Sequence, residues 1–380
     1  MMKVIKGLGI FVGLICSLLV FTVVCLVAIN ATDRTKSPNT LLVENWLKQQ
    51  PIDPSENGYE YAITIVGTIG DDKTNDKKPL ISFSEQEVEL TDNFKTACYQ
   101  TDLIICSEFI SDNSDSIRNV IGAHKANIQQ YNTLLDMPYW QEEPQSLTPN
   151  NQAHWGLLFK LRDVRQLAAI ISVDTSGNKL DQQAAVAFLN KDAHFWNMVY
   201  HSSRSTLNHM IAVNMIKYQL NLASTLAKTT DTAVVTKVTA WQTSFELTDS
   251  DFERIFSGEW LFAHNVTEQM LIEVQSDSVA FYEKWLAYAL LKPTDSDNLM
   301  AEYIVSLVKE PVSTTSTHTL KEPNYCSNDN YFQQLWMLRY NPIGKLFNCT
   351  VYGTDYKQRL TNMNTELEQL RTNLLTAKSS

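Results

Sequence analysis

Hydrophobic residues recur at intervals of three and four along most of this chain, a spacing that places them on one face of an α-helix. The segments that show this period are 114–135, 154–173, 180–226, 245–274, 276–291, 297–309 and the stretch from 354 onward. Prolines and a turn at 174–178 separate several of them. The pattern predicts a mainly α-helical domain with a bundle-like arrangement.

Two parts of the chain depart from this pattern. Tyr59 to Gly67 is rich in aromatic and β-branched residues, which predicts a minor β element, although the same short apolar run also fits the first turns of a buried helix. Prolines gather between residues 138 and 150, and we expect a sub-boundary of the domain there.

The most apolar part of the chain lies at its beginning. Gly7 to Ile29 runs for twenty-three residues without a charge, and a helix of that length covers the roughly 30 Å of a bilayer's hydrocarbon core. Lys3 and Lys6 precede it, and basic residues are retained on the cytoplasmic side. The sequence therefore predicts a cytoplasmic tail at 1–6, a transmembrane anchor at 7–29, a stalk at 30–40 and an exported helical domain at 41–380.

A cleaved signal peptide is the alternative interpretation of this segment. Signal peptides have an apolar region of about 7–15 residues and end in small residues. Here the apolar run is longer, and the best exit, Ile29-Asn30-Ala31, has isoleucine where a small residue is required. Both departures favour a retained anchor.

Charge and glycine content narrow the range of ligands. The net charge is −11, acidic residues are spread along the chain, and no basic run is interleaved with aromatics, so nucleic acid is not expected as a partner. Neither GxGxxG nor GxxxxGKS/T occurs, and such glycine-rich loops are what bring backbone amides close to phosphates. The sequence therefore predicts no nucleotide partner.

Six cysteines divide into two groups. Cys16 and Cys25 lie in the apolar run. The exported part holds Cys98, Cys106, Cys326 and Cys349. An even number of cysteines in an exported domain predicts disulfides, with three pairings open, of which the local one, 98 with 106 and 326 with 349, is the simplest. A zinc site is the competing interpretation, but the chain has no CxxC pair and no histidine at ligand spacing from these cysteines.

Three histidines fall on one predicted helix. His194, His201 and His209 are not at the i, i+4 spacing of helical metal ligands such as those of HExxH, and aromatic and aliphatic residues surround them in the sequence. We expect packing or surface roles for them and assign no metal ligand.

An acidic segment near residue 250 has two interpretations. The side chains that fit an acid–base cluster for hydrolysis are Asp249, Asp251, Glu253, Glu259 and His264. However, Thr248 and Asp251 form a capping box, which explains the first acids as residues of a helix N-terminus. The Asp-Ser-Asp triplets at 249–251 and 295–297 resemble the DxD metal motif of lumenal glycosyltransferases, but both lie at predicted helix starts. We therefore assign no catalytic residue.

One stretch combines aromatic, basic and turn residues. Leu335 to Phe347 lies between Cys326 and Cys349, and Asn341 followed by Pro342 is a helix start signal. The residues predicted to bind a partner are Arg339, Tyr340, Asn341, Pro342 and Lys345. A buried loop-to-helix junction is the alternative interpretation.

Several short motifs occur together in this chain. They are the run from Asn57 to Gly67, the cysteine pair 98 and 106, Phe195-Trp196 leading to Met210-Ile211-Ala212, and Asn341-Pro342-Ile343-Gly344-Lys345 followed by Tyr356 and Arg359. In these motifs the chain resembles an uncharacterised family of bacterial inner-membrane-anchored, periplasm-facing proteins with an Asn-Pro-Ile/Val-Gly-Lys motif. The resemblance implies a single-pass protein of the bacterial inner membrane, with a cytoplasmic N-terminus and most of the chain in the periplasm. It implies no activity.

Together these features predict a membrane-anchored periplasmic interaction, scaffold or accessory protein of the cell envelope, which binds a protein partner and needs no cofactor. The alternative is an envelope enzyme, a hydrolase or transferase acting on a cell-wall or polysaccharide substrate. The chain has eight tryptophans, and the flat faces of their rings suit the sugar rings of such a substrate. A deep cleft lined by two carboxylates about 5–10 Å apart would favour the enzyme.

Overall fold

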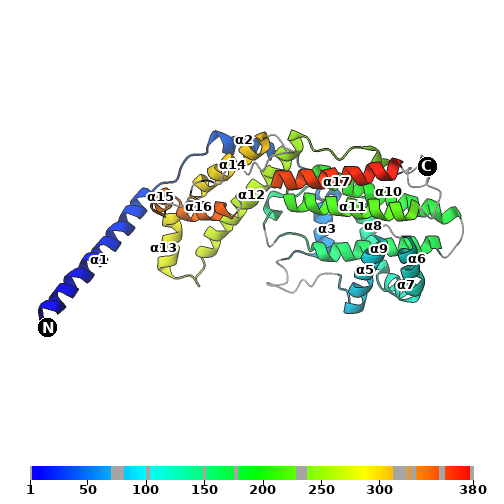
Figure 1. The fold of residues 1–380 in the computed structure, drawn as a ribbon, viewed down its shortest axis with the longest axis horizontal. Coiled ribbons are helices and arrows are strands. Elements are labelled where there is room, and N and C mark those ends of the chain that lie inside the picture. Colours follow the sequence, from blue (N-terminus) through cyan, green and yellow to red (C-terminus); the bar gives the residue numbers. More distant parts are fainter. Residues whose placement is uncertain are drawn as a thin grey trace. The chain divides into compact units, whose positions relative to one another are not determined.

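The regular structure of this chain is helical (Figure 1). The computed structural model describes residues 2–69, 81–99, 103–148, 151–174, 179–227, 238–310, 323, 325–326, 331–350 and 356–376. Within these ranges β pairing is confined to two isolated bridges, Asn57 with Tyr139 and Thr68 with Ala153. The predicted mainly α-helical fold is confirmed.

The chain divides into two compact units. Unit 1 consists of Met1–Leu47 and Trp260–Asp355, and unit 2 consists of Lys48–Glu259 and Tyr356–Ser380. Residues 138–150, where the sequence predicts a sub-boundary, lie inside unit 2.

Unit 1 is built around one central helix. Its helices are α1 (Met2–Ile29), α2 (Pro38–Trp46), the later part of α12 (Asp249–Val274), α13 (Phe281–Leu290), α14 (Pro293–Lys309), α15 (Tyr331–Met337) and α16 (Pro342–Cys349). α14 contacts both α2 and α16. Met300, Ile304 and Val308 are buried on α14 at four-residue intervals. The apolar residues that recur with the helical period in the sequence therefore form the face by which α14 packs against the rest of unit 1.

Unit 2 holds the larger helical core. Its helices are η1 (Pro54–Glu56), α3 (Gly58–Val66), α5 (Glu85–Cys98), α6 (Leu103–Asp112), α7 (Ser114–Ala123), α8 (Lys125–Leu134), η2 (Pro144–Ser146), α9 (Trp155–Asp174), α10 (Lys179–Ser202), α11 (Thr206–Ala227), η4 (Thr239–Gln242), the start of α12 and α17 (Tyr356–Thr376). α11 packs against α10 and α17, and α9 packs against α5, α7, α8 and α10 (Figure 1).

Two predicted helix faces form this core. Leu158, Leu161 and Val164 of α9 are fully buried. Leu360 and Leu367 of α17 are also fully buried against the rest of unit 2. The last helix therefore docks on the core of its own unit.

The minor β element predicted near residues 59–67 is wrong, because this segment forms helix α3. The Asn57 side chain accepts a hydrogen bond from the Tyr59 N–H at 3.1 Å and caps the helix. Tyr59, Ala62 and Ile65 are buried at three-residue intervals, a period that a strand cannot present to one side. Burial of this face outweighs the β propensity of the individual residues.

The four cysteines outside the apolar run form the two local disulfides. Cys98 pairs with Cys106, which ties the end of α5 to α6, and Cys326 pairs with Cys349, which ties the preceding loop to the end of α16. The predicted disulfides are confirmed, and the pairing left open by the sequence is the local one.

Helix α1 covers the predicted anchor. Side chains at 1–10, 12 and 19 are outside the described set, and among the others Leu14, Leu18 and Phe21 are exposed. Over the described residues, none of the helices combines the length and the apolar character needed to cross a membrane. The anchor at 7–29 therefore stays a prediction.

Candidate functional site

In unit 1 the stalk that follows α1 meets the first turns of α14 and α16. We call this region, formed by residues 30–40, 292–302 and 339–345, the stalk junction. It contains all five residues that the sequence predicts to bind a partner, together with the second Asp-Ser-Asp triplet.

Asn341 organises the stalk junction. It is fully buried and adopts a left-handed backbone conformation with φ 49°. Its side-chain oxygen accepts hydrogen bonds from the N–H groups of Gly344 at 3.2 Å and Lys292 at 2.9 Å. Its amide nitrogen donates to Asp295 and Ser296, each at 3.0 Å. One asparagine therefore caps α16 and fixes it to the start of α14.

The end of α1 is bound to the same residue. The Asn341 N–H donates to the side-chain oxygen of Asn30 at 2.7 Å. The Asn30 amide nitrogen donates in turn to the carbonyls of Arg339 and Leu26, both at 2.8 Å. Because Asn30 is buried and follows α1 directly, these bonds fix the stalk's first residue to the motif around Asn341.

Gly344 allows α16 to approach α14 closely. A Cβ atom at this position would lie 2.0 Å from the Ser296 hydroxyl and 2.5 Å from the Asn341 side-chain amide. Such distances are far below van der Waals contact. The glycine of the Asn-Pro-Ile-Gly-Lys motif is therefore required by packing.

Gly344→Ala should lower the free energy of unfolding by about 1–3 kcal/mol, because the new methyl overpacks the junction. Urea titration of the wild type and the variant measures the loss. The double variant Gly344→Ala with Ser296→Ala removes the nearest clashing atom and should recover part of it. An unchanged unfolding free energy for Gly344→Ala alone would show that the junction does not exclude a side chain.

Asp295 is the buried charge of the junction. It is fully buried, and its carboxylate pairs with the Arg34 guanidinium at 3.0 Å. Arg34 is 61 % exposed and also lies over the Tyr340 ring, 4.8 Å from its centroid. The Asp33 carboxylate accepts hydrogen bonds from the N–H groups of Thr294 at 2.9 Å and Asp295 at 3.1 Å, and so caps α14. Two consecutive stalk residues thus bind the same helix start.

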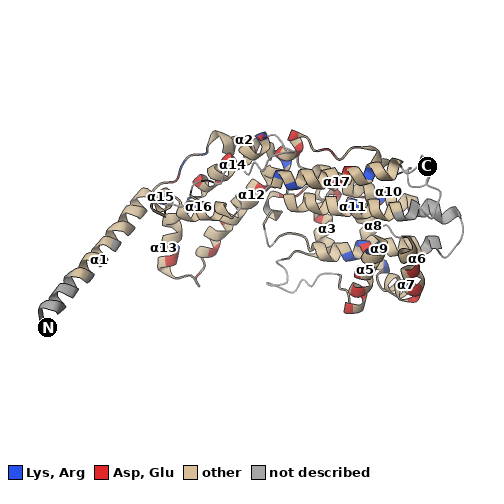
Figure 2. Cartoon of the chain, in the orientation of Figure 1, with Lys and Arg blue, Asp and Glu red and all other residues tan. Residues whose placement is uncertain are grey.

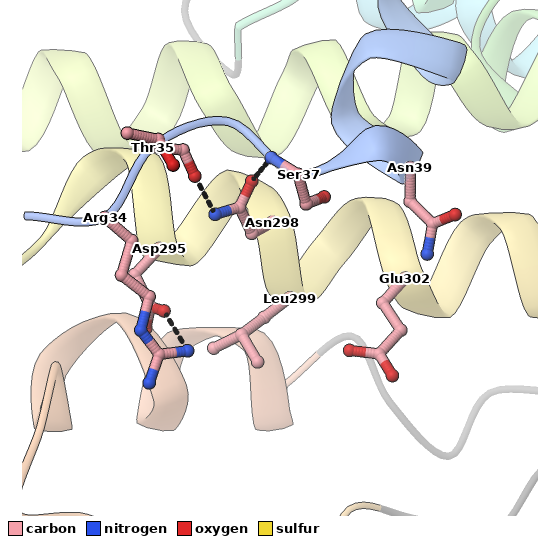
Figure 3. A pocket seen from close by; sticks show the side chains of 8 residues that line it. All are labelled: Arg34, Thr35, Ser37, Asn39, Asp295, Asn298, Leu299 and Glu302. Carbon is pink, nitrogen blue, oxygen red and sulfur yellow. Dashed lines mark hydrogen bonds and ion pairs between the residues drawn. The ribbon is translucent and has the colours of Figure 1, made fainter.

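A pocket of about 400 Å³ opens beside this ion pair (Figure 3). It is lined by Arg34, Thr35, Ser37, Asn39, Asp295, Asn298, Leu299 and Glu302. Figure 3 shows Arg34 and Glu302 at opposite ends, with Leu299 between them. The Asn298 side chain accepts a hydrogen bond from the Ser37 N–H at 2.7 Å and donates one to the Thr35 carbonyl at 2.9 Å. These bonds fix the stalk to α14 at the wall of the pocket. Seven of its eight lining residues are polar or charged, and opposite charges lie at its two ends.

The predicted partner-binding residues border this region without lining the pocket. The Arg339 guanidinium lies 3.7 Å from the centroid of the Trp336 ring. Lys345 donates to the Met337 carbonyl at 2.7 Å, and burial lowers the pKa of its ammonium group. Burial raises the pKa of Tyr340, which donates to the Thr32 carbonyl at 3.1 Å. Asn341 fits the interpretation as a buried loop-to-helix junction, and Pro342 is the first residue of α16.

Sequence reasoning missed the residues that build the pocket. Arg34, Asn298 and Glu302 carry no motif, and the stalk is separated from α14 by about 260 positions. The Asp-Ser-Asp triplet at 295–297 was the available signal, but it also fits an ordinary helix start. In the structure Asp297 pairs with His264 at 2.9 Å, and this hydrogen bond raises the pKa of the imidazole.

The other sequence candidates are used within the fold. Thr248 and Asp251 form the predicted capping box at the start of α12, with hydrogen bonds of 2.9 and 3.3 Å between each backbone N–H and the other side chain. His194 and His201 are exposed on α10, and His209 is buried on α11. In the part of the chain that the structure describes, no three His, Cys, Asp or Glu residues could together hold a metal ion.

Unit 2 contains a second, smaller cleft. It encloses about 130 Å³ and is lined by Lys95, Phe159, Asp163, Ile211, Asn214, Met215 and Tyr218. Burial raises the pKa of Asp163 to about 6, and its carboxylate pairs with Lys95 at 3.0 Å. Ligand sites usually enclose about 300–1,000 Å³. The volume therefore favours the stalk junction, rather than this cleft, as the candidate site.

Buried His209 makes unit 2 sensitive to acid. Burial, with a contribution from the Arg254 charge, lowers the pKa of His209 to about 3, and its Nδ1 atom lies 3.2 Å from the Tyr200 carbonyl. The imidazole is therefore neutral in the folded state at pH 7. In the unfolded chain the pKa of this histidine is about 6.5, so the unfolded state gains a proton at a higher pH than the folded state does. The free energy of unfolding therefore keeps its full value above pH 6.5 and falls as the pH is lowered toward 3.

His209→Gln should remove this acid sensitivity, because the amide can donate to Tyr200 but does not gain a proton. Asp163 has the opposite effect on stability below pH 6, because its raised pKa makes the folded state bind a proton more tightly than the unfolded state. The wild type and the variant must therefore be compared at each pH. Between pH 6.5 and 5 the variant should lose about 2 kcal/mol less unfolding free energy than the wild type. Urea titrations at several pH values measure this, with the exposed His194→Gln as a control. Parallel stability profiles would contradict the prediction.

Comparisons with known proteins give no relative from which a function of the stalk junction could be transferred. No protein-family model matches the chain, and no curated protein or solved structure is significantly similar to it. Its function is therefore argued from its own chemistry.

Proposed function

We propose that this protein is a single-pass, membrane-anchored protein of the bacterial cell envelope that faces the periplasm and acts by binding another envelope protein, as a scaffold or accessory subunit. The stalk junction is its binding site. The observation that carries this proposal is the exposed Arg34 side chain, held by Asp295 and Tyr340 at one end of a pocket of about 400 Å³ that is lined mostly by polar residues.

The charge pattern around α1 supports the anchor. Residues 7–29 carry no charge, Lys3 and Lys6 precede them, and no charged residue colours the described part of α1 in Figure 2. The exposed apolar side chains of α1 suit a hydrocarbon environment better than water. The basic residues favour a cytoplasmic N-terminus.

The disulfides support an oxidising compartment. Cys98–Cys106 and Cys326–Cys349 occur in different units, and disulfides persist in the periplasm but are rare in the cytosol. The resemblance to periplasm-facing inner-membrane proteins points to the same location.

The pocket's chemistry supports recognition of a polar peptide segment. Arg34 offers a planar set of donors suited to a carboxylate. Glu302 lies at the other end, where its carboxylate is able to accept hydrogen bonds from a basic or amide group of a ligand. Since Arg34 is already held by the Asp295 ion pair and by stacking on Tyr340, it loses little conformational freedom on binding.

The same carboxylates argue against the envelope enzyme. Asp295 and Glu302 are the two carboxylates that line the pocket. Asp295 is committed to Arg34 and Asn341. Binding therefore accounts for the pocket better than hydrolysis does.

Photocrosslinking in intact cells tests this function. A photoreactive amino acid at position 39 or 302 should give a discrete crosslinked product, because both positions line the pocket. Position 309 is exposed on the same helix but outside the pocket and is the matched control. Glu302→Gln, in a chain with the photoreactive residue at 39, should reduce the yield several-fold. Equal yields at 39, 302 and 309, or no product at any of them, would contradict the proposal.

A further inference from the structure

Helices α13 and α15 of unit 1 expose an unusual number of large side chains. Neither helix has a buried residue. We give the name aromatic collar to seven of their exposed large side chains, which are Phe281, Tyr282, Trp285 and Tyr288 of α13 and Tyr331, Leu335 and Trp336 of α15. Phe281 is 83 % exposed, Tyr331 79 % and Trp336 67 %. Apolar surface gathered in this way marks an interaction site.

The aromatic collar lies beside the end of α1. Helix α13 contacts both α1 and α16. Residue Arg339, two positions after α15 ends, accepts a hydrogen bond from Asn30, the first residue after α1. Figure 1 shows α13 and α15 next to the carboxyl end of α1. The collar is therefore placed where the proposed anchor leaves the membrane.

The side chains of the collar have the chemistry of a bilayer interface. Tryptophan and tyrosine combine an apolar ring with a polar group, and they are enriched at the level of lipid headgroups. Arg339 lies over the Trp336 ring and presents a cation beside it. Lys284 lies on the first turn of α13, where its ammonium group donates to the Gln275 carbonyl at 3.1 Å. Long basic side chains of this kind reach toward lipid phosphates while their stems stay on apolar surface.

We propose that the aromatic collar lies in the headgroup region of the bilayer that α1 crosses, so that α13 and α15 hold unit 1 against the membrane surface. This inference rests on the anchor in the proposed function. Insertion of aromatic rings, rather than charge attraction, drives the contact, because the chain has a net charge of −11 and α13 itself carries Glu283. The contact should therefore form on zwitterionic lipid and resist added salt.

Tryptophan quenching by brominated lipid tests the inference on the full chain in phosphatidylcholine liposomes. The chain has eight tryptophans, none of them within residues 1–29, so quenching cannot come from α1. Bromine atoms near the headgroups should quench the wild type. Trp285→Phe with Trp336→Phe keeps the collar apolar and should abolish most of the quenching. Trp241→Phe removes a tryptophan that is buried in unit 2 and is the control.

Each outcome of this experiment separates the collar from the anchor. Quenching that disappears only in the Trp285 and Trp336 double variant, and that persists at high salt, supports the inference. An unquenched chain that still resists alkaline extraction from liposomes keeps the anchor and overturns the collar, and a second copy or a protein partner covering the collar gives this result. A chain that alkaline extraction removes from the liposomes overturns the anchor. In that case the collar is supported only if Trp285 and Trp336 are quenched on the liposomes before the extraction, and it is overturned if they are not.

Discussion

Arg162→Met should lower the free energy of unfolding of unit 2 by about 3–5 kcal/mol, because it leaves a buried carboxylate without its counter-ion. Arg162 is fully buried and donates to the Asp192 carboxylate with two N–H groups, each at 3.2 Å. It also donates to the Met215 carbonyl at 2.9 Å. Urea titration of the solubilised chain, followed by tryptophan fluorescence, measures the loss.

The partner of Arg162 provides the control. Asp192 also accepts hydrogen bonds from the Tyr131 hydroxyl at 2.7 Å and from the Gln219 amide. In the double variant Arg162→Met with Asp192→Asn, the amide oxygen still accepts the bond from the Tyr131 hydroxyl, and neither residue of the former ion pair carries a charge. We expect the double variant to recover more than half of the lost stability. A loss below about 1 kcal/mol for Arg162→Met alone would show that the ion pair is not buried as described.

Gly258→Ala should destabilise unit 2 by more than about 3 kcal/mol, because the backbone itself blocks a side chain there. A Cβ atom at this position would lie 1.7 Å from the Arg204 carbonyl oxygen and 2.5 Å from its carbon. The Arg204 N–H donates to the buried Glu142 carboxylate at 2.5 Å, and the Asn208 amide donates to it at 2.8 Å. Moving this backbone would therefore also break the hydrogen bonds of a buried acid.

Gly122→Ala is the matched control for Gly258→Ala. Gly122 is also helical, on α7, and a Cβ atom there would have no neighbour within 4 Å. Alanine should stabilise this helix by about 0.5–1 kcal/mol. Equal effects of the two substitutions on the urea midpoint would contradict the described contact between α12 and the turn that precedes α11.

Local sequence signals predicted the parts of the fold that depend on neighbouring residues. The capping box of Thr248 and Asp251 and the start of α16 at Asn341 and Pro342 were predictable, because each involves residues within one helical turn. The break between α7 and α8 at His124 was not predictable, because the apolar period of the sequence continues through it. There the imidazole bonds to Glu87 at 3.1 Å, a contact across 37 positions that no local pattern shows.

The candidate site shows the same limit more clearly. Sequence reasoning found Asn341 and its motif, but it did not find Asn30, Arg34 or Asp295 as their partners. Asn30 and Asn341 bond across 311 positions, and the stalk reads as an ordinary polar linker. A pocket formed by two such distant segments depends on the tertiary fold, which the helical period alone does not determine.

The central claim is that residues 7–29 stay in the bilayer and place the two helical units in the periplasm. A phosphatase that is active only in an oxidising compartment, fused after residue 380, tests it most directly in growing bacteria. The fusion should be active and membrane-bound, and both properties should be lost when residues 7–29 are deleted. Activity of a cytosol-dependent reporter at the same position, with the phosphatase fusion inactive, would contradict the anchor, the compartment and the function built on them.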